Sequence, residues 1–525
     1  MRVLLVEPDY RRDSRSTIEK AAAMSSASKR RGDESLWYPP LGLMKLATFH
    51  KMRGDEVHFV YGCIPQRDLF ALSESWDRIY ITTLFTFQWV KTIETINYYK
   101  NLVWGDTSKV FVGGIMASLL PEKVHEATGI YPVKGVIRSP EQIGLPGTEN
   151  IDSLAPDYNL LNNNLYAINN TYYAYTTRGC KNECPWCGVP ILEPGGVYYI
   201  DIKEMIRGMR REHGDKPKLK LMDNNVLASS DLEKIVKDLI ELGYGRNMVT
   251  NTDPPRERII DFNQGLDASF LTEKNMKLLA KLNIKPMRIA FDRIGEKDEY
   301  LRALKIAKKY GVRVFSNYML YNYQDTPKDL YKRLIVNINL NKRWRNKRGR
   351  PTASIYSYPM RYAPIDSTDS PTAISQENGI CVPTKPLADQ DGTYNGIFWT
   401  KRFIRNIEIM KGAAYGSISP TPSLARRTLG KTFREFVANL YMPEELLRYR
   451  NKYEQEVYKF EPKRDPGTGE IESFRVFISK LLETKGRRFT AFHYVVSKNK
   501  KQAIRGFLAS CEDEEVKKWL RYYLL

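Results

Sequence analysis

Three cysteines carry the clearest chemical signal in the sequence. Cys180, Cys184 and Cys187 lie within eight residues at CxxxCxxC spacing, and no fourth cysteine or histidine stands nearby. A cubane iron-sulfur cluster has four irons, each of which takes a thiolate. Three thiolates leave one iron free to bind another ligand. The spacing therefore predicts a [4Fe-4S] cluster with these three metal ligands and one open iron where chemistry can occur.

Structural zinc is the main alternative for these cysteines. Such sites are usually closed and four-coordinate, with their ligands in two CxxC-like knuckles. The other cysteines, Cys63, Cys381 and Cys511, are scattered singly, and the nearest histidines, His125 and His213, are far away in sequence. The ligand count therefore favours the iron-sulfur cluster over zinc.

The cysteine run, with Trp186 directly before its last cysteine, resembles the signature of the radical S-adenosylmethionine (SAM) superfamily. The resemblance implies that the open iron chelates the amino and carboxylate groups of SAM. It also implies that an electron from the reduced cluster cleaves SAM to a 5′-deoxyadenosyl radical. The three cysteines would then be ligands rather than nucleophiles, and Trp186 would lie beside the cofactor. An electron donor such as flavodoxin or ferredoxin is the expected partner.

Length and composition place these cysteines in a large globular chain. At 525 residues we expect three domains, at 1–150, 165–370 and 385–525. No run of 18 or more apolar residues occurs, and the first residues continue directly into a strand pattern. The chain has six cysteines, and half of them lie in one cluster, which indicates a reducing compartment rather than a disulfide framework. We expect a cytoplasmic protein without a membrane partner.

The first domain has the pattern of a doubly wound parallel sheet. Apolar, β-branched runs alternate with helical stretches, which predicts a Rossmann-like α/β domain. The polar insertion at about 11–35 is expected to be a mobile loop. The predicted strands are 2–6, 57–60, 79–82 and 110–112.

Residues 1–150 also resemble the cobalamin-binding-type domain that precedes many radical SAM cores. The resemblance rests on the turn at 39–43, Gly113-Gly114 at a strand end, and Pro156-Asp157-Tyr158 before the core. The Asp-x-His-x-x-Gly motif, which supplies a histidine to cobalt in that fold, has no match around any of the five histidines. We therefore favour a domain without cobalamin, which serves as scaffold or substrate-recognition module. Cobalamin bound with its lower face unligated is the alternative.

The middle of the chain is predicted to form the catalytic core, a partial (β/α)6 barrel of the TIM type. Short apolar strands alternate with amphipathic helices, of which 231–242 is the clearest. In parallel sheets of this kind, active groups gather at the carboxyl ends of the strands. The predicted strands are 173–177, 219–222, 260–263, 288–291, 312–320 and 354–358.

Polar residues follow three of these strands and are candidates for binding SAM. Asp223 and Asn224 come after the second strand, where the resemblance implies an acidic group that hydrogen-bonds the SAM ammonium. Gln264 follows the third strand and Asp292 the fourth. Each residue also has a structural alternative. Asp223 and Asn224 could cap a turn, Gln264 could satisfy buried backbone groups, and Asp292 could form an ion pair with Arg288 or Arg293. No catalytic residue is assigned.

Positive charge suggests a polyanionic partner. The formal net charge is +21 and the pI is near 9.4. The run 342–350 holds six cations and a tryptophan without an acidic residue, and we expect it beside the active face. Its cations suit phosphates and its indole suits an unpaired base. A solvated loop with the tryptophan in the core is the alternative. The predicted substrate-binding residues are Lys342, Arg343, Trp344, Arg345, Lys347, Arg348 and Arg350.

Together these signals predict a radical SAM enzyme that modifies a large anionic substrate, with nucleic acid first. One alternative is a radical SAM enzyme, with or without cobalamin, that acts on a peptide or small metabolite in the manner of a methyltransferase. Another is a non-catalytic iron-sulfur protein that binds nucleic acid. The region 385–525 is predicted to be a mainly helical, basic domain without an assigned role.

Overall fold

A computed structural model gives the fold of the chain. It describes residues 1–10, 37–65, 68, 75–161, 165–362, 376–377, 380–381, 399–414, 416–457, 468–484 and 486–525. The insertion at 11–35, expected to be a mobile loop, lies outside these residues. The described residues form two compact units, 1–285 and 286–525. The division falls inside the predicted barrel segment 165–370, and the predicted boundaries at 150, 165, 370 and 385 stay predictions.

Unit 1 opens with the predicted parallel sheet. Its strands are β1 (Arg2–Glu7), β2 (Glu56–Tyr61), β3 (Arg78–Thr83) and β4 (Val110–Gly114), and all four sequence-based strands are confirmed. Their order is β2-β1-β3-β4, with every pairing parallel. The order changes direction beside β1, which is the topology of a doubly wound sheet.

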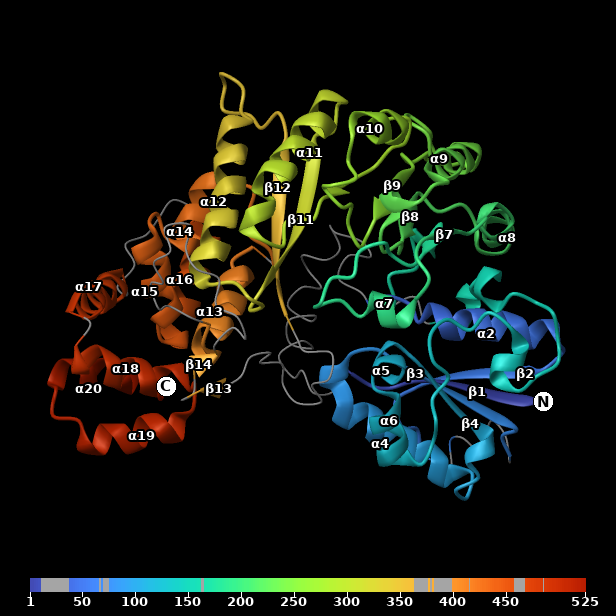
Figure 1. Ribbon diagram of the computed structural model, residues 1–525, viewed down its shortest axis with the longest axis horizontal. Coiled ribbons are helices and arrows are strands. Elements are labelled where there is room, and N and C mark those ends of the chain that lie inside the picture. Colours follow the sequence, from blue (N-terminus) through green and yellow to red (C-terminus); the bar gives the residue numbers. More distant parts are fainter. Residues whose placement is uncertain are drawn as a thin grey trace. The chain divides into compact units, whose positions relative to one another are not determined.

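Helices cover both faces of this sheet, so each strand is buried on two sides. Helix α2 (Leu41–Met52) packs on one face through Leu43, Leu46 and Phe49. On the other face lie α4 (Trp89–Leu102), α5 (Ile115–Leu119) and α6 (Pro121–Thr128) (Figure 1). Burial on both faces explains the nearly continuous apolar runs that identified the strands.

The rest of unit 1 is the first part of the predicted core. Strands β5 (Thr171–Ala174), β8 (Lys218–Leu221) and β9 (Ile259–Phe262) form a parallel sheet in that order. A short antiparallel pair, β6 (Thr177–Arg178) with β7 (Tyr198–Tyr199), stands at its carboxyl end. The helices are α7 (Val189–Leu192), α8 (Lys203–His213), α9 (Leu232–Glu241) and α10 (Glu273–Leu279).

Unit 2 begins with the second part of the core. Strands β10 (Met287–Arg288), β11 (Val314–Tyr321) and β12 (Ser354–Arg361) form a parallel sheet. Helix α11 (Lys297–Lys309) connects the first two strands, and α12 (Pro327–Arg343) connects the last two. Thr326 caps α12 by accepting from the Asp329 amide, and Pro327 follows at the first helical position, as expected. All six core strands of the sequence prediction are therefore present.

The C-terminal part of unit 2 is mainly helical, as predicted. Apolar side chains such as Phe403, Phe436 and Phe474 are fully buried there. A short pair, β13 (Gln376–Glu377) with β14 (Ile380–Cys381), precedes the helices. The helices are α13 (Lys401–Gly412), α14 (Pro422–Leu429), α15 (Phe433–Tyr441), α16 (Glu444–Val457), α17 (Thr468–Thr484), α18 (Arg487–Ser497), α19 (Lys501–Ser510) and α20 (Glu514–Tyr522).

The position of the basic run 342–350 differs from the expectation. It begins in the last turn of α12, at Lys342 and Arg343, and ends before the first residue of β12, where Ser354 pairs with Val314 at the start of β11. A loop that leads from a helix into the next parallel strand lies at the amino edge of the sheet, whereas active groups gather at the carboxyl edge. The run therefore does not lie beside the active face of its sheet.

Candidate active site

The three cysteines stand in a closed loop at the carboxyl end of β5. This segment, residues 177–199, is called the cluster loop here. The β6–β7 pairing joins its two ends, with Thr177 opposite Tyr199. Gly179 has φ +82°, and a Cβ atom on it would lie 1.8 Å from the carbonyl oxygen of Gly196. Only glycine fits at this crossing, so the residue directly before Cys180 is fixed by the loop geometry.

Hydrogen-bond donors point at two of the three sulfurs. The Asn182 amide lies 3.3 Å from Cys180 Sγ, and the Val189 amide lies 3.5 Å from Cys187 Sγ. The Asn225 side chain adds an Nδ2 donor at 3.6 Å from Cys180 Sγ. Such donors stabilise thiolate charge and set the potential of an iron-sulfur cluster. None of the three cysteines forms a disulfide and all three are half-buried, so this donor set fits a thiolate-bound cluster.

The cluster site is assigned from the cysteine spacing, these donors and the family match reported below. Among the described residues, no group of three histidine, cysteine or acidic side chains is arranged so that it could hold a metal ion. When bound, a [4Fe-4S] cluster supplies the electron that cleaves SAM.

A second layer of side chains holds these donors in place. Asp267 Oδ2 accepts from Asn182 Nδ2 at 2.6 Å and from Asn225 Nδ2 at 3.4 Å. Its Oδ1 accepts from the amide and hydroxyl of Ser269. Asp267 thus anchors two amide side chains, one of which donates directly to Cys180. Asn182, Asn225 and Asp267 were not singled out from the sequence, because their partners lie up to 85 residues apart.

Asp223 lies at the end of β8 beside the start of the cluster loop. Its Oδ1 accepts from Thr176 Oγ1 at 2.5 Å, from the Thr177 amide at 2.5 Å and from Thr177 Oγ1 at 2.8 Å. Its Oδ2 is buried without a hydrogen-bond partner. Burial raises the pKa of this carboxyl, while the threonine donors oppose that shift. One oxygen therefore fixes the loop and the other remains for a donor such as an ammonium group.

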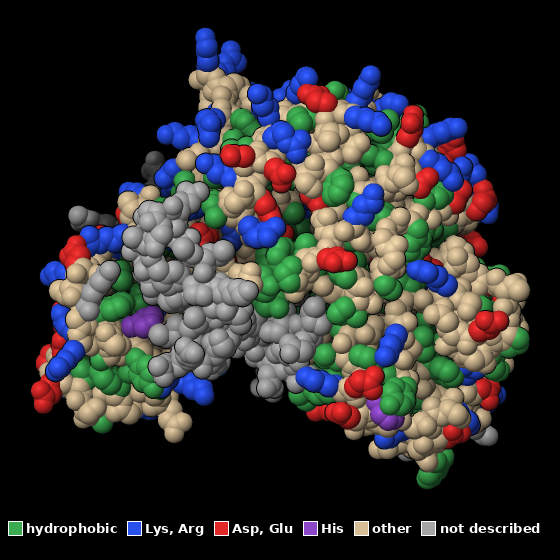
Figure 2. All heavy atoms as spheres, in the orientation of Figure 1, with side chains coloured by type: hydrophobic (Ala, Val, Ile, Leu, Met, Phe, Trp, Pro, Cys, Tyr) green, Lys and Arg blue, Asp and Glu red, His purple; other side chains and the backbone are tan. Residues whose placement is uncertain are grey.

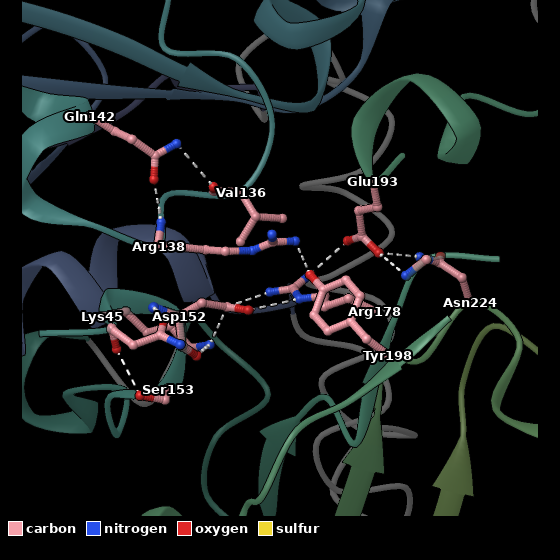
Figure 3. Close-up of polar contacts among 12 residues, drawn as sticks. Lys45, Val136, Arg138, Gln142, Asp152, Ser153, Arg178, Glu193, Tyr198 and Asn224 are labelled. Carbon is pink, nitrogen blue, oxygen red and sulfur yellow. Dashed lines mark hydrogen bonds and ion pairs between the residues drawn. The ribbon is translucent and has the colours of Figure 1, made fainter. Parts of the chain in front are cut away.

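A buried charge network links the cluster loop to helix α2, which packs on the N-terminal sheet. It consists of Lys45, Asp152, Arg178 and Glu193, each no more than 9% exposed (Figure 3). Arg178 donates to Asp152 Oδ1 at 2.6 Å and to Glu193 Oε1 at 2.8 Å. Lys45 Nζ lies 2.7 Å from Asp152 Oδ1. Two cations and two carboxylates balance, so the network is neutral. The four residues of the network are distant from one another in sequence, so no local sequence motif predicted it.

The same network reaches the backbone beside Cys180. Glu193 Oε2 accepts from the Gly179 amide at 2.7 Å and from Asn224 Nδ2 at 2.8 Å. Burial by itself would raise the pKa of Asp152, but the charges of Lys45 and Arg178 lower it to about 2. A buried carboxylate held ionised by two cations gives the loop a rigid support, and Asn224 acts through Glu193 as part of it.

A cavity of about 280 Å³ lies next to this network. On one side it is bounded by the carboxyl ends of β3 and β4, including Gly113 and Gly114. A Cβ atom at Gly114 would lie 2.3 Å from the Thr83 carbonyl oxygen. Glycine therefore allows the ends of β3 and β4 to pack closely at this point. The opposite side is formed by the cluster loop and the ends of β8 and β9, through Arg178, Val189, Leu192, Glu193, Met222, Asn224 and Gln264.

The structure brings the four predicted cofactor residues of unit 1 to this region. Asp223, Asn224 and Gln264 lie at the ends of β8 and β9, and Trp186 is half-buried in the cluster loop. Asp292 belongs to the other unit, where its Oδ1 accepts from the Leu320 amide at 2.8 Å and burial raises its pKa. This contact is with backbone on β11, whereas the structural alternative for Asp292 was an ion pair with Arg288 or Arg293. The SAM-binding roles stay predictions.

The predicted substrate-binding residues lie together in unit 2. Lys342, Arg343, Arg345, Lys347, Arg348 and Arg350 are all exposed. Trp344 is half-buried, with its ring centroid 5.5 Å from that of Phe315. This packing corresponds to the alternative in which the tryptophan is held by the core, and the substrate-binding role of the run stays a prediction.

A three-cysteine loop at the carboxyl edge of a parallel α/β sheet defines an enzyme class that cleaves SAM through an iron-sulfur cluster. Residues 174–334 match the model of the Radical SAM superfamily. The chain therefore carries a radical SAM domain and is an enzyme of that class.

Two solved structures resemble the chain at low identity. One is the radical SAM methyltransferase TsrM from Kitasatospora setae, with cobalamin and a [4Fe-4S] cluster bound. It is 15% identical over 69% of this chain and 74% of its own, with a TM-score of 0.46. The other is the cobalamin-dependent radical enzyme OxsB, with aqua-cobalamin and SAM bound. It is 12% identical over 99% of this chain and 83% of its own, with a TM-score of 0.49. No curated protein matches the sequence.

No described helix combines the length and apolar composition needed to cross a bilayer.

Proposed function

We propose that this radical SAM enzyme binds cobalamin at the cavity beside the cluster loop, which receives part of the corrin ring, and modifies a small organic substrate next to it. One observation carries the proposal. The cavity is bounded at once by the strand ends of the N-terminal sheet and by residues that flank the cluster cysteines. A ligand in it would contact the doubly wound domain on one side and lie next to the radical centre on the other. This reverses the sequence-based preference for a domain without cobalamin.

The chemistry of the walls supports a neutral ligand with a large apolar surface. Leu43, Phe111 and Ile143 are among the apolar side chains that line the cavity. The polar wall is the buried charge network, whose four charges already satisfy one another. An ionic ligand would find no uncompensated charge there, whereas the neutral amides around a corrin ring need only hydrogen bonds. Cobalamin, when bound, supplies a carrier for methyl groups.

None of the described residues that line the cavity is a histidine. Cobalamin bound there would have no imidazole from the protein on its lower face, which was the alternative left open by the missing Asp-x-His-x-x-Gly motif. The roles of the chain's own residues are then simple. The network positions the loop, the apolar wall excludes water, and the glycine pair admits the ligand close to backbone.

Reconstitution under anaerobic conditions tests the proposal. Protein carrying its cluster is incubated with hydroxocobalamin, freed of unbound ligand, and examined by absorbance and by electron paramagnetic resonance (EPR) after reduction. We expect stoichiometric cobalamin whose cob(II)alamin spectrum shows no protein nitrogen on cobalt. Val136 lines the cavity and is half-buried, so V136W should fill the space and abolish cobalamin binding while iron content is kept. V136A is the matched control and should still bind.

Two outcomes would contradict the proposal. The first is absence of bound cobalamin in protein that carries its full iron. The second is equal binding by the V136W and V136A variants, which would place the ligand elsewhere.

The remaining expectations are parts of this proposal rather than findings. Flavodoxin or ferredoxin is the proposed reductant, and the reducing compartment indicated by the cysteine distribution is the cytoplasm. Nucleic acid is the second candidate substrate, favoured by the exposed cations at 342–350. Nucleoside mass spectrometry on cells with and without the protein tests it. A modified nucleoside that depends on the protein would replace the small-molecule proposal.

A further inference from the structure

Two stretches without acidic residues meet at the amino edge of the sheet in unit 2. No aspartate or glutamate occurs at 301–324 or at 330–364. Four of the five cations of the first stretch lie toward the end of α11 or at the approach to β11, and six of the nine cations of the second lie at the end of α12 or in the turn before β12. We call this surface the basic edge: Lys305, Lys308, Lys309, Arg313, Lys342, Arg343, Arg345, Lys347, Arg348 and Arg350.

These cations lie on the surface and share one edge. Nine of the ten are exposed and Lys308 is half-buried. Ser354 at the start of β12 donates its amide to the Arg313 carbonyl, which joins the two acid-free stretches directly. The concentration of charge on one edge gives a positive field that local carboxylates do not cancel. Figure 2 shows lysine and arginine side chains gathered at the projecting tip above α12.

The tip itself is a preformed turn, residues 345–351. Arg345 and Pro351 form an antiparallel bridge, and Arg345 Nη1 donates to the Gly349 carbonyl at 2.7 Å. Asn346 Oδ1 accepts from the amides of Arg348 and Arg350, both at 3.0 Å. These bonds hold the backbone in one conformation and leave the cationic side chains outside. Figure 1 shows the turn extending past the end of α12. A narrow, rigid, cationic projection fits a groove rather than a flat surface.

A surface groove of about 360 Å³ lies at the base of this turn. Its walls are Lys305, Lys308, Lys309 and Trp344 together with three leucines. Lys308 Nζ lies 5.9 Å from the centre of the Trp344 ring, and the ring also packs on Phe315. Because the indole is held by the core, it is not placed to intercalate. The groove therefore combines lysine side chains with an apolar surface. This combination suits a sugar-phosphate backbone rather than an unpaired base.

We propose that the basic edge binds double-stranded nucleic acid through its phosphates, with the 345–351 turn entering a groove. The major groove of B-form DNA, about 12 Å wide, admits a two-stranded ribbon, whereas the deep, narrow major groove of A-form RNA does not admit side chains. An acidic polypeptide would meet the same charges but has no groove for the projection. This surface lies at the amino edge of its sheet, whereas active groups gather at the carboxyl edge.

Fluorescence anisotropy with labelled duplexes of about 20 base pairs tests the proposal, in DNA and RNA forms of one sequence. The full chain should bind DNA with an affinity that falls about 10³-fold between about 50 and 200 mM salt, as for about six phosphate contacts. The variant with K342Q, R343Q, R345Q, K347Q, R348Q and R350Q should lose about 10²-fold in affinity and most of the salt slope. Equal DNA and RNA binding would keep the phosphate contacts but overturn entry of the turn into the major groove.

A matched control removes the same charge from unit 1. The exposed cations Lys234, Lys237, Arg246, Lys274, Lys277 and Lys281 are replaced by glutamine. This control should bind DNA within about threefold of the unchanged protein, since it leaves the basic edge intact. Equal losses in both variants would mean that net charge alone attracts DNA and would overturn the proposal. Displacement of DNA by polyglutamate at equal charge concentration would assign the surface to an acidic protein instead. Thermal unfolding followed by circular dichroism confirms that both variants are folded.

Discussion

Charged residues are used in opposite ways in the two units. In unit 1, Arg178 is buried between Asp152 and Glu193, and Lys45 completes a neutral set. In unit 2, the cations of the basic edge are exposed within acid-free stretches. A buried charge must be paired, because losing its hydration costs several kcal/mol. An exposed cation needs no partner within the chain. The pairing therefore marks Arg178 as a positioning residue and the basic edge as a surface for association.

The comparison also separates catalysis from net charge. The high pI describes the chain as a whole, whereas the residues that support the cluster loop form a neutral set beside an apolar cavity. Substitutions in unit 1 should therefore change iron binding and stability without changing salt dependence. Substitutions at the basic edge should do the reverse.

The largest effect should follow loss of a cluster ligand. Replacing Cys180, Cys184 or Cys187 by alanine should abolish iron incorporation and reduce SAM cleavage to background, because each supplies one of only three thiolates. Iron analysis and 5′-deoxyadenosine formation measure this. C63A is the matched control, since Cys63 is also a cysteine of unit 1 outside any disulfide but lies away from the cluster loop in sequence, and it should keep both properties. A fully loaded C184A protein would refute the assignment.

Breaking the buried charge network should be the next largest effect. R178M should lower the free energy of unfolding by about 3–5 kcal/mol, because it leaves Asp152 and Glu193 buried without their shared cation. Urea unfolding measures the change. Arg138, which is exposed and bonds Tyr198, is the matched control, and R138M should cost no more than about 1 kcal/mol. Similar losses in the two variants would remove the distinction between the buried and exposed cations.

The pH dependence of stability tests the same network more finely. The pKa of Asp152 is lowered to about 2, below its value in an unfolded chain. Its contribution is therefore fully present above about pH 4 and is lost as the pH falls toward 2, a change of about 2 kcal/mol. The urea midpoint of D152N relative to the unchanged protein should show its largest difference above pH 4. A difference that does not shrink on acidification would mean that Asp152 is not ionised in the folded state.

The smallest effect should concern the donor to Cys180. N225L removes the Nδ2 donor and should lower the midpoint potential of the cluster by about 60 mV, if that bond favours the more negative reduced state by about 1.4 kcal/mol. A redox titration followed by EPR measures the shift. N224L, at the neighbouring residue that bonds Glu193 rather than a sulfur, is the control and should shift the potential less. A larger shift in N224L than in N225L would reassign the donor.

Local signals in the sequence were sufficient for the strands and for the cysteine loop. Val3 to Val6 and Ile79 to Ile81 contain the apolar runs that buried parallel strands require, and the cysteine spacing lies within one loop. The supports of that loop could not be predicted in the same way. Arg178 meets Asp152 across 26 residues and Asn182 meets Asp267 across 85, so only the folded chain brings them together.

The basic run shows a different kind of error. Its substrate-binding role stays a prediction, but its expected place beside the active face was wrong. The connection from β11 through α12 to the parallel strand β12 returns the chain to the amino edge of the sheet. The position of the run is therefore set by the topology of the sheet and not by the composition of the run. The prediction for Trp344 used its neighbours in sequence, whereas its burial depends on packing against Phe315 on β11.

The most direct test of the account is the EPR spectrum of the anaerobically purified, reduced protein before and after addition of SAM. The three cysteines of the cluster loop should yield a [4Fe-4S]⁺ signal whose g-values shift when SAM binds the open iron, with nitrogen coupling from SAM labelled at its amino group. A signal that SAM leaves unchanged, or a protein that carries zinc in place of iron, would contradict the assignment of this loop as the radical centre.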